Sequence, residues 1–276
     1  MATLATRTGG VGDTMAASRL NPVLRSRAVG NRRRMEKDMS DMPDRPQRKS
    51  ILLVGASRGL GEAMARVFVQ KSWHVVGTVR GDGPNLLRDL ARDHPEQVEV
   101  ERLDITDPTQ IAALGERLAG RVFDILFVNA GITNDDQSET IAETSTEEFV
   151  RVMVTNVLGV MRTVEGLQNR VRDHGLIGVM SSGQGSIANN EKGGHEVYRG
   201  SKAALNQYMR SYAARHASDG RALVLMAPGW IRTGLGGPDA PFGIEETIPE
   251  LVDTLLAQQG RAGCRFIDRH GETVPW

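Results

Sequence analysis

The stretch ILLVGASRGLGEAMA, residues 51–65, decides the fold. It starts as a short apolar run, passes through three glycines and continues into residues that favour a helix. Gly55, Gly59 and Gly61 therefore follow an expected strand and cross the start of an expected helix. A turn of this kind directs backbone N–H groups and the positive end of the helix dipole toward one point, and glycine allows a pyrophosphate to approach closely. The stretch predicts a dinucleotide site, although a tight turn without a ligand has the same local pattern.

Short apolar runs alternate with longer helical stretches from Ser50 onward. The expected strands cover residues 51–55, 73–79, 98–104, 123–131, 175–182 and 221–229. The expected helices cover residues 60–71, 85–93, 108–119, 146–172, 197–217 and 245–259. This alternation implies right-handed crossovers and a parallel sheet with helices on both faces. We predict an α/β fold, a Rossmann-type doubly wound parallel sheet in a single domain over residues 50–276, with ligands at the carboxyl ends of the strands.

Residues 1–49 differ from the rest of the chain in charge and pattern. They contain eleven of the 34 Lys and Arg residues but only five of the 34 Asp and Glu residues, and they show no sustained apolar periodicity. We therefore expect a disordered basic extension. An organelle-targeting segment, a tail that contacts anionic partners, and a dispensable extension ahead of a later start at Met35, Met39 or Met42 all stay open.

The composition argues against several classes of protein. Cys264 is the single cysteine, so the chain has no internal disulfide, and no Cys/His cluster indicates a metal site. Residues 50–276 carry 23 Lys and Arg against 29 Asp and Glu, which argues against a nucleic-acid-binding surface. No apolar run approaches the roughly 18 residues of a membrane span. We expect a cytoplasmic protein, with organelle targeting by residues 1–49 left open.

Further motifs follow the glycine turn in a recognisable order. They are NAG at 129–131, Asn156 within VTNVLG, the pair Ser181 and Ser182, Tyr198 with Lys202, and PGWIRT at 228–233. With GASRGLG they resemble the short-chain dehydrogenase/reductase family over essentially all of residues 51–276. Val54 departs from the pattern, because the family usually has a threonine there whose hydroxyl helps to fix the turn. The tail GCRFIDRHGETVPW, residues 263–276, is similar to that of the C-factor and sniffer carbonyl reductase subgroup.

The resemblance implies a catalytic set of Asn156, Ser182, Tyr198 and Lys202. On its own, the four-residue spacing of Tyr198 and Lys202 only places both on one helical face. In the family, the tyrosine protonates the carbonyl oxygen, the lysine also binds the nicotinamide ribose, the asparagine holds a relay water, and the serine hydrogen-bonds the substrate oxygen. We expect the Lys202 ammonium and the positive ring of an oxidised nicotinamide to lower the pKa of Tyr198 below its usual value of about 10.

Two other serines compete with Ser182 for that role. Ser182 is favoured over Ser181 because the active serine of the family ends the run after the fifth strand. The distance in sequence from Ser182 to Tyr198 exceeds the usual family spacing, so the loop between them carries a small insertion. Ser186 is the alternative if the register differs. We expect His195, which lies three residues before Tyr198, to be a capping or loop residue.

The same resemblance implies a cofactor site and a choice of cofactor. Its contacts would come from Gly55, Ser57, Arg58, Gly59, Leu60, Gly61, Arg80, Asp104, Ile105, Asn129, Ala130, Gly131, Tyr198, Lys202, Pro228, Gly229, Ile231 and Thr233. Arg58 and Arg80 favour NADP(H), because a ribose phosphate attracts a guanidinium. Asp82 supports a free ribose hydroxyl instead, so NAD(H) stays open.

These motifs predict an NADPH-dependent oxidoreductase that transfers a hydride between the nicotinamide and a small carbonyl or alcohol substrate. The alternative is an NADP(H)-binding signalling or regulatory protein of the C-factor type with little turnover. The glycine-rich segment of residues 234–247 matches the substrate lid of the family. Helices over 146–172 and 197–217 correspond to those that pack between subunits, so we expect a homodimer or homotetramer and no metal, nucleic-acid or membrane partner.

Overall fold

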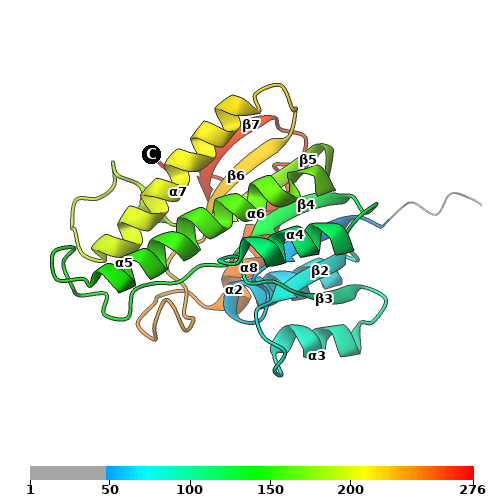
Figure 1. The fold of residues 1–276 in the computed structure, drawn as a ribbon, viewed down its shortest axis with the longest axis horizontal. Coiled ribbons are helices and arrows are strands. Elements are labelled where there is room, and N and C mark those ends of the chain that lie inside the picture. The colour runs from blue at the N-terminus through cyan, green and yellow to red at the C-terminus, as the bar shows by residue number, and fades with distance from the viewer. Residues whose placement is uncertain (1–47) are drawn as a thin grey trace, which may run out of the picture. The chain divides into compact units, whose positions relative to one another are not determined.

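Within residues 48–276, which the computed structural model describes, seven parallel strands form one sheet in the order β3-β2-β1-β4-β5-β6-β7 (Figure 1). The strands are β1 (Ser50–Val54), β2 (His74–Val79), β3 (Val98–Arg102), β4 (Phe123–Val128), β5 (Val171–Met180), β6 (Ala222–Ala227) and β7 (Gly263–Asp268). The expected basic extension lies outside the described residues, apart from Arg48 and Lys49. The predicted doubly wound α/β fold is confirmed.

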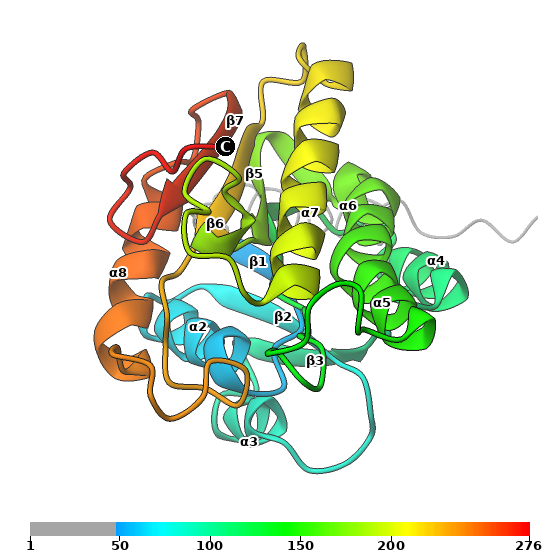
Figure 2. The same cartoon turned by 90° about the vertical axis from the view of Figure 1, so that its left-hand side faces the viewer.

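Helices connect the strands and cover both faces of the sheet (Figures 1 and 2). They are α2 (Gly59–Gln70), α3 (Leu86–Asp93), α4 (Pro108–Arg117), α5 (Thr146–Met153), α6 (Val160–Leu167), α7 (Glu196–Arg215) and α8 (Ile244–Leu256). Several begin at a side chain that accepts a backbone N–H, as Asn85 does before α3 and Ser145 before α5. Such caps satisfy donors that the first turn of a helix leaves without a partner.

Two buried cores flank the sheet, because alternate residues of a strand point to opposite faces. Ile51 and Leu53 of β1 lie in the core shared with α2, α3 and α8. Leu52 and Val54 lie in the core shared with α4, α6 and α7. Burial on both faces explains why the central strands are continuous apolar runs rather than alternating ones.

The strand order places the switch point of the sheet between β1 and β4. From β1 the chain winds outward through β2 and β3 on one side, and from β4 through β5, β6 and β7 on the other. The carboxyl ends of β1 and β4 are therefore neighbours, with their following loops diverging to opposite faces. Ligands of open α/β sheets bind at such a point.

The helix expected over residues 146–172 differs from the prediction. A π-helix, Val154–Gly159, joins α5 to α6, and a short 3₁₀ turn ends the helical segment at Arg170. Val171 instead begins β5 and pairs with Phe123 of β4. The register then shifts, with His174 in the left-handed region at φ 62°, which makes β5 longer than the sequence pattern indicated.

Residues 48–276 contain neither a membrane-spanning helix nor a metal-binding group. None of their helices has the length and apolar character to cross a membrane. Their His, Cys, Asp and Glu side chains form no group of three or more with the spacing to hold a metal ion.

Candidate active site

The glycine turn between β1 and α2 has the geometry that the sequence predicts. Gly55 and Gly59 adopt φ values of 84° and 59°, which favour glycine. A Cβ on Gly55 would lie 2.8 Å from the Ala130 backbone, and one on Gly61 would lie 2.1 Å from the Gly55 carbonyl oxygen. Space around Gly59 is open instead, since nothing lies within 4 Å of a Cβ built there. The glycines thus let the turn close against β4 while leaving one side accessible.

The remaining turn residues lie around this opening. Ser57 is partly exposed, Arg58 is exposed at the N-cap of α2, and Leu60 packs at the edge of the core. No side chain accepts a hydrogen bond from the first turn of α2, since Arg58 at the N-cap has no acceptor atom. The backbone N–H groups of that turn therefore face the opening at Gly59 without a side-chain partner. The arrangement suits an anionic ligand at the helix N-terminus.

Thr78 of β2 supplies a hydroxyl to the turn that the sequence analysis missed. Its Oγ1 accepts a hydrogen bond from the backbone N–H of Gly55 at 3.1 Å, and its carbonyl oxygen accepts one from Ala56 at 2.9 Å. Thr78 is buried, so the bond is shielded from water. Val54 removes the usual hydroxyl from the end of β1, and a neighbouring strand provides one instead. The single polar residue inside the apolar run VVGTV is the signal that identifies it.

The charged residues around the tip of β2 differ in whether they have an ion-pair partner within the protein. Arg58 and Arg80 are exposed, and no carboxylate among the described residues pairs with either. Asp82 instead forms an ion pair with Arg102 at 3.1 Å and lies 3.9 Å from Arg88. The two guanidinium groups are thus available to a phosphate, whereas the carboxylate that would select a ribose hydroxyl is already engaged.

Asp104 and Ile105 follow β3 at the same edge of the sheet. The Asp104 carboxylate accepts hydrogen bonds from the Thr106 backbone N–H at 2.9 Å and hydroxyl at 2.7 Å. Ile105 is buried. These bonds fix the loop after β3 in the region where an adenine would lie next to β1 and β2.

The segment Asn129–Gly131 connects the glycine turn to the residues of α7. Asn129 Nδ2 donates to the Gly55 carbonyl at 2.8 Å, and Ala130 closes against Gly55. A Cβ on Gly131 would lie 3.3 Å from Lys202 Nζ and 3.4 Å from Asn156 Oδ1. Gly131 therefore lies between the cofactor side and the predicted catalytic residues.

Asn156 sits in the π-helix and is fully buried. Its amide makes reciprocal 2.8 Å bonds with the Ile132 backbone, accepting from the N–H and donating to the carbonyl. Asn156 Nδ2 also donates to Ser201 Oγ at 2.9 Å, which ties the π-helix to α7. The wider π turn directs the amide toward the sheet edge, and such turns often occur at functional sites. Neither the π-helix nor the role of Ser201 was predicted.

Ser182, and not Ser181 or Ser186, lies against Tyr198. The Ser182 hydroxyl accepts from the Gln184 backbone N–H at 3.1 Å and lies near enough to Tyr198 to act on the pKa of its phenol, which it lowers. Ser181 is buried, and its hydroxyl donates to Asn206 Oδ1 at 2.6 Å. Ser186 is also buried, and its hydroxyl accepts from the Asn189 backbone N–H at 3.1 Å. Each of the two competing serines thus has a partner of its own.

Tyr198 and Lys202 lie together on the first turns of α7. Lys202 is almost fully buried, its Nζ donates to the Met180 carbonyl at 2.9 Å, and it lies 5.6 Å from the centroid of the Tyr198 ring. Burial lowers the pKa of Lys202 from 10.5 to about 8. Burial also raises the pKa of Tyr198 from 10.0 to about 12, against the opposing effect of Ser182.

The expectation that Lys202 and an oxidised nicotinamide together lower the pKa of Tyr198 stays a prediction, because this raised value comes from the protein's own groups. Removing the phenol from water disfavours its anion, and burial likewise makes the Lys202 ammonium lose its charge more easily. Tyr198 consequently keeps its proton at neutral pH. That is the state in which a tyrosine can act as a proton donor.

His195 precedes α7 in a left-handed conformation, with φ 51° and ψ 38°. Its side chain makes no capping hydrogen bond. The expectation that His195 is a loop residue is confirmed, and the expectation that its side chain caps the helix is wrong.

The segment after β6 forms the remaining wall. Pro228 and Gly229 leave the strand, Ile231 is buried and bridges to Phe242, and Thr233 Oγ1 accepts from the Gly236 N–H at 3.0 Å. The bridge closes the segment into a loop ahead of α8. The predicted nicotinamide-contacting residues thus share one loop whose two ends meet.

Arg269, which follows β7, holds the base of that loop. Its guanidinium lies 4.2 Å from the centroid of the Phe242 ring and 3.5 Å from the Pro228 carbonyl oxygen. Glu250 of α8 pairs with it at 3.3 Å. Arg269 was not singled out from the sequence, because its partners lie far from it along the chain.

Comparisons with known proteins agree with this arrangement. A family model described as enoyl-(acyl carrier protein) reductase matches residues 55–247. The chain is similar to a short-chain dehydrogenase/reductase from Burkholderia multivorans solved with bound NADP, with 61% identity, a TM-score of 0.82, and coverage of 83% of this chain and 100% of that chain. It is also similar to a carbonyl reductase from Pseudomonas aeruginosa PAO1 in complex with NADP, with 33% identity, a TM-score of 0.77 and the same coverage.

Among curated proteins, the C-signal of Myxococcus xanthus is 31% identical over 155 residues, which is 55% of this chain and 92% of that protein. A motif order that runs through every parallel strand, a family match over more than half of the sequence and these neighbours lead to one conclusion. The chain belongs to the short-chain dehydrogenase/reductase family, and it is an oxidoreductase that acts on CH–OH or C=O groups.

Proposed function

We propose that the protein is an NADPH-dependent carbonyl reductase in which Tyr198 is the general acid. The convergence of Ser182, Tyr198, Lys202 and Asn156 beside Gly131 carries this proposal. A proton donor, a hydroxyl and a buried cation are the groups that carbonyl reduction needs around one oxygen atom.

When bound, the nicotinamide supplies the hydride. Tyr198 donates its proton to the carbonyl oxygen, and Ser182 donates a hydrogen bond to the same oxygen as negative charge develops there. Lys202 lies behind Tyr198, where its positive charge stabilises the phenolate left after proton transfer. Asn156 holds the loop after β4 in place and orients Ser201 on α7, so it fixes the distance between Tyr198 and the sheet.

The residues fit NADP(H) better than NAD(H). The open side of the glycine turn, the N-terminus of α2 and the exposed Arg58 and Arg80 suit a dinucleotide with an additional phosphate. Asp82 is occupied by Arg102 and Arg88. Two similar proteins have been solved with NADP, which also supports this choice.

The alternative, a signalling or regulatory protein that binds NADP(H) with little turnover, is not favoured. The likeness to the C-signal covers only 55% of this chain. A protein that only senses the cofactor has no need of a protonated tyrosine held between a serine and a buried lysine.

The test is turnover of NADPH by purified protein with a panel of aldehydes and ketones, followed by absorbance. We expect Tyr198→Phe to lower kcat by about 10²- to 10⁴-fold while NADPH binding is unchanged. Tyr208→Phe is the matched control, because Tyr208 lies on the same helix with 53% of its surface exposed. NADPH binding without Tyr198-dependent turnover of any carbonyl would contradict the proposal and support the signalling alternative.

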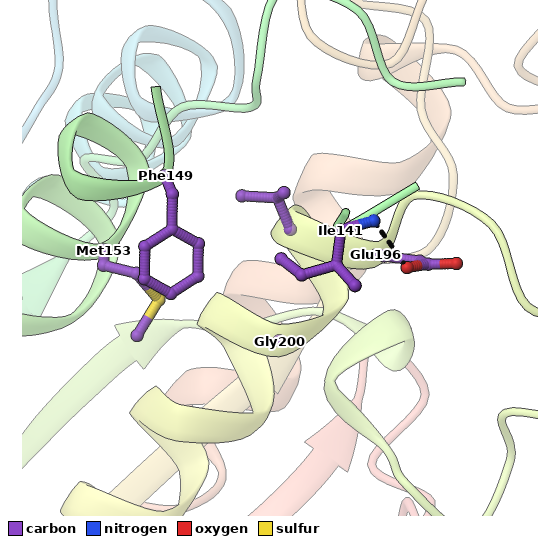
Figure 3. Close-up of a pocket in the computed structure, with 6 residues that line it drawn as sticks. Ile141, Phe149, Met153, Glu196 and Gly200 are labelled. Atoms are coloured by element: carbon purple, nitrogen blue, oxygen red, sulfur yellow. Dashed lines mark hydrogen bonds between the residues drawn. The ribbon is translucent and has the colours of Figure 1, made fainter. Parts of the chain in front are cut away.

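A homodimer or homotetramer and a cytoplasmic location complete the proposal. Apolar side chains from α5 and α7 surround a shallow pocket lined by Ile141, Phe149, Met153, Glu196, Val197 and Gly200 (Figure 3). Ile141 and Phe149 are 51% and 40% exposed, which is high for large apolar residues and supports a protein interface there. A monomeric mass in light scattering at micromolar concentration would contradict the oligomer.

A further inference from the structure

The loop between Ser182 and Tyr198 is fixed firmly in its first part. Asn206 of α7 accepts from Ser181 and donates to the Gly185 carbonyl at 3.2 Å. Gly185 packs so closely on α7 that a Cβ there would lie 2.9 Å from Lys202 Cβ. The chain just after Ser182 is therefore held by α7 itself.

The next anchor comes from the far end of the described chain. The backbone N–H of Ala188 donates to the Trp276 carbonyl oxygen at 3.0 Å. The Trp276 ring packs on Phe266 of β7 at 5.4 Å between centroids, and the Arg210 guanidinium of α7 lies 4.7 Å from the Trp276 centroid. Val274 N–H also donates to the Phe266 carbonyl at 2.9 Å. Trp276 thus connects the loop after Ser182 with both β7 and α7.

Beyond the buried Gly185 and Ser186 the loop runs at the surface. Residues 187–194 are all exposed. Gly193, Gly194 and His195 then take three consecutive positive φ values of 65°, 70° and 51° before α7 begins. The Arg199 guanidinium donates to the Gly194 carbonyl at 2.8 Å and marks the far end of the segment. We call residues 189–194 the flap. It is held at its start by Ala188 and by the bond from the Asn189 N–H to Ser186 Oγ, and at its end by Gly194.

We propose that Trp276 is a positioning residue for the reaction: its ring, held by Phe266 and Arg210, fixes Ala188 and thereby the course of the loop that follows Ser182. Trp276 acts through the Ala188 amide and does not touch the substrate. The inference rests on the proposed function, since it takes Ser182 and Tyr198 as the groups that bind the carbonyl oxygen. The insertion in this loop therefore has a fixed half and a free half, with Trp276 at the boundary.

Trp276→Ala removes the ring that holds the tail and leaves the backbone oxygen free to drift. We expect a roughly five- to tenfold rise in KM for the carbonyl substrate, the scale of one lost hydrogen bond, with the Kd for NADPH unchanged. Trypsin cleavage after the exposed Lys192 should become several-fold faster, because the flap loses the anchor at Ala188. Trp276→Phe retains an aromatic ring for Phe266 and Arg210 and should behave as the wild type in both measurements.

Arg210→Ala is the second variant, because it removes the cation above the ring without changing the tail. We expect the same changes at roughly two- to threefold. Arg92→Ala is its control, since Arg92 is exposed on α3 and pairs only with Asp89 among the described residues. Thermal unfolding of each variant establishes that it is folded before kinetics are compared.

Unchanged KM and unchanged cleavage after Lys192 in folded Trp276→Ala would overturn the inference, as would an equal rise in the Kd for NADPH. If the wild type reduces no carbonyl, the proposed function fails, but the cleavage rate still tests whether Trp276 holds the flap. The two failures are therefore distinguishable. Fragments are identified by mass spectrometry, so that cleavage after Lys192 is separated from cleavage elsewhere.

Discussion

The cofactor side and the substrate side of this site are built in different ways. The cofactor side consists of the glycine turn, Thr78 and residues 129–131, and its contacts are mostly backbone groups and buried side chains at strand ends. The proposed substrate side consists of the loop of residues 183–195 and the glycine-rich segment of residues 234–247. Its anchors are single side chains from remote elements, namely Trp276 and Arg269.

This difference separates what the fold determines from what the loops determine. A parallel sheet places the ends of β1, β2 and β4 side by side whatever the surface residues are, so the cofactor side follows from the topology. The substrate side depends on a few distant contacts that can change independently. Substitutions on the cofactor side should therefore alter cofactor binding or stability, whereas those on the substrate side should alter KM for the carbonyl.

The largest effect that sharpens this comparison concerns the two exposed arginines. Arg58→Ala combined with Arg80→Ala should raise the KM for NADPH by roughly 10²- to 10⁴-fold, because each charge-assisted hydrogen bond to a phosphate contributes about 1.5–3 kcal/mol. The KM for NADH and for the carbonyl should change little. Steady-state kinetics with both cofactors make the measurement, with Arg92→Ala as the control. Equal rises in the KM for NADPH and in the KM for NADH would show that the two arginines do not bind the ribose phosphate.

A smaller effect concerns the stability of the cofactor-free protein and its dependence on pH. Lys202 has a pKa of about 8 when folded and an ordinary value of 10.5 when unfolded, so the unfolded chain binds more protons between these values. The free energy of unfolding should therefore rise with pH in this window, by about 3 kcal/mol at most.

Urea unfolding between pH ~7 and ~9.5, compared with Lys202→Met, isolates this contribution. The wild type should gain stability relative to the variant as the pH rises. The raised pKa of Tyr198 acts above pH 10 and in the opposite direction, so it does not enter the window. If the difference in free energy of unfolding between the wild type and Lys202→Met stays constant with pH, the pKa of Lys202 is not lowered by burial.

The smallest effect concerns Thr78 and the turn. Thr78→Val leaves the Gly55 N–H without its acceptor, which should lower the free energy of unfolding by about 1–3 kcal/mol and weaken NADPH binding. Thr78→Ser retains the hydroxyl and should recover both. Thermal unfolding and NADPH titration provide the comparison. If Thr78→Val is as stable as the wild type and binds NADPH as tightly, the turn does not depend on the Thr78 hydroxyl to replace the one that is missing at Val54.

The sequence predicted the turns and strand ends at this edge of the sheet, because their signals are local. The glycines, the strand ends and the four-residue spacing of Tyr198 and Lys202 each act within a few positions, and the resemblance identified Ser182, which does lie against Tyr198. The π-helix at Asn156 was missed, because it depends on bonds to Ile132 and Ser201 that no local pattern encodes. The residue roles themselves stay predictions until variants are measured.

The effect of burial on pKa values and the long-range anchors could not be predicted from the sequence. The pKa of Tyr198 depends on how completely the fold removes its hydroxyl from water, which charge spacing alone does not reveal. Trp276 and Ala188 are 88 residues apart, and only the register of β7 beside β6 brings them together. The tail was recognised as a family-like motif, but its contact with the loop required the three-dimensional structure.

The flap has a practical consequence for protein engineering. Ala188 and Gly194, at its two ends, are both held by partners outside the segment, and only short-range bonds from Asn189 to Ser186 and from Asn190 to Ile187 join it to the rest of the loop. Sequences of other lengths can be exchanged there while Ser182 and Tyr198 keep their supports on α7. A library confined to the flap would vary the entrance to the site and leave the chemistry constant, which makes it the natural starting point for changing which carbonyl compounds the protein accepts.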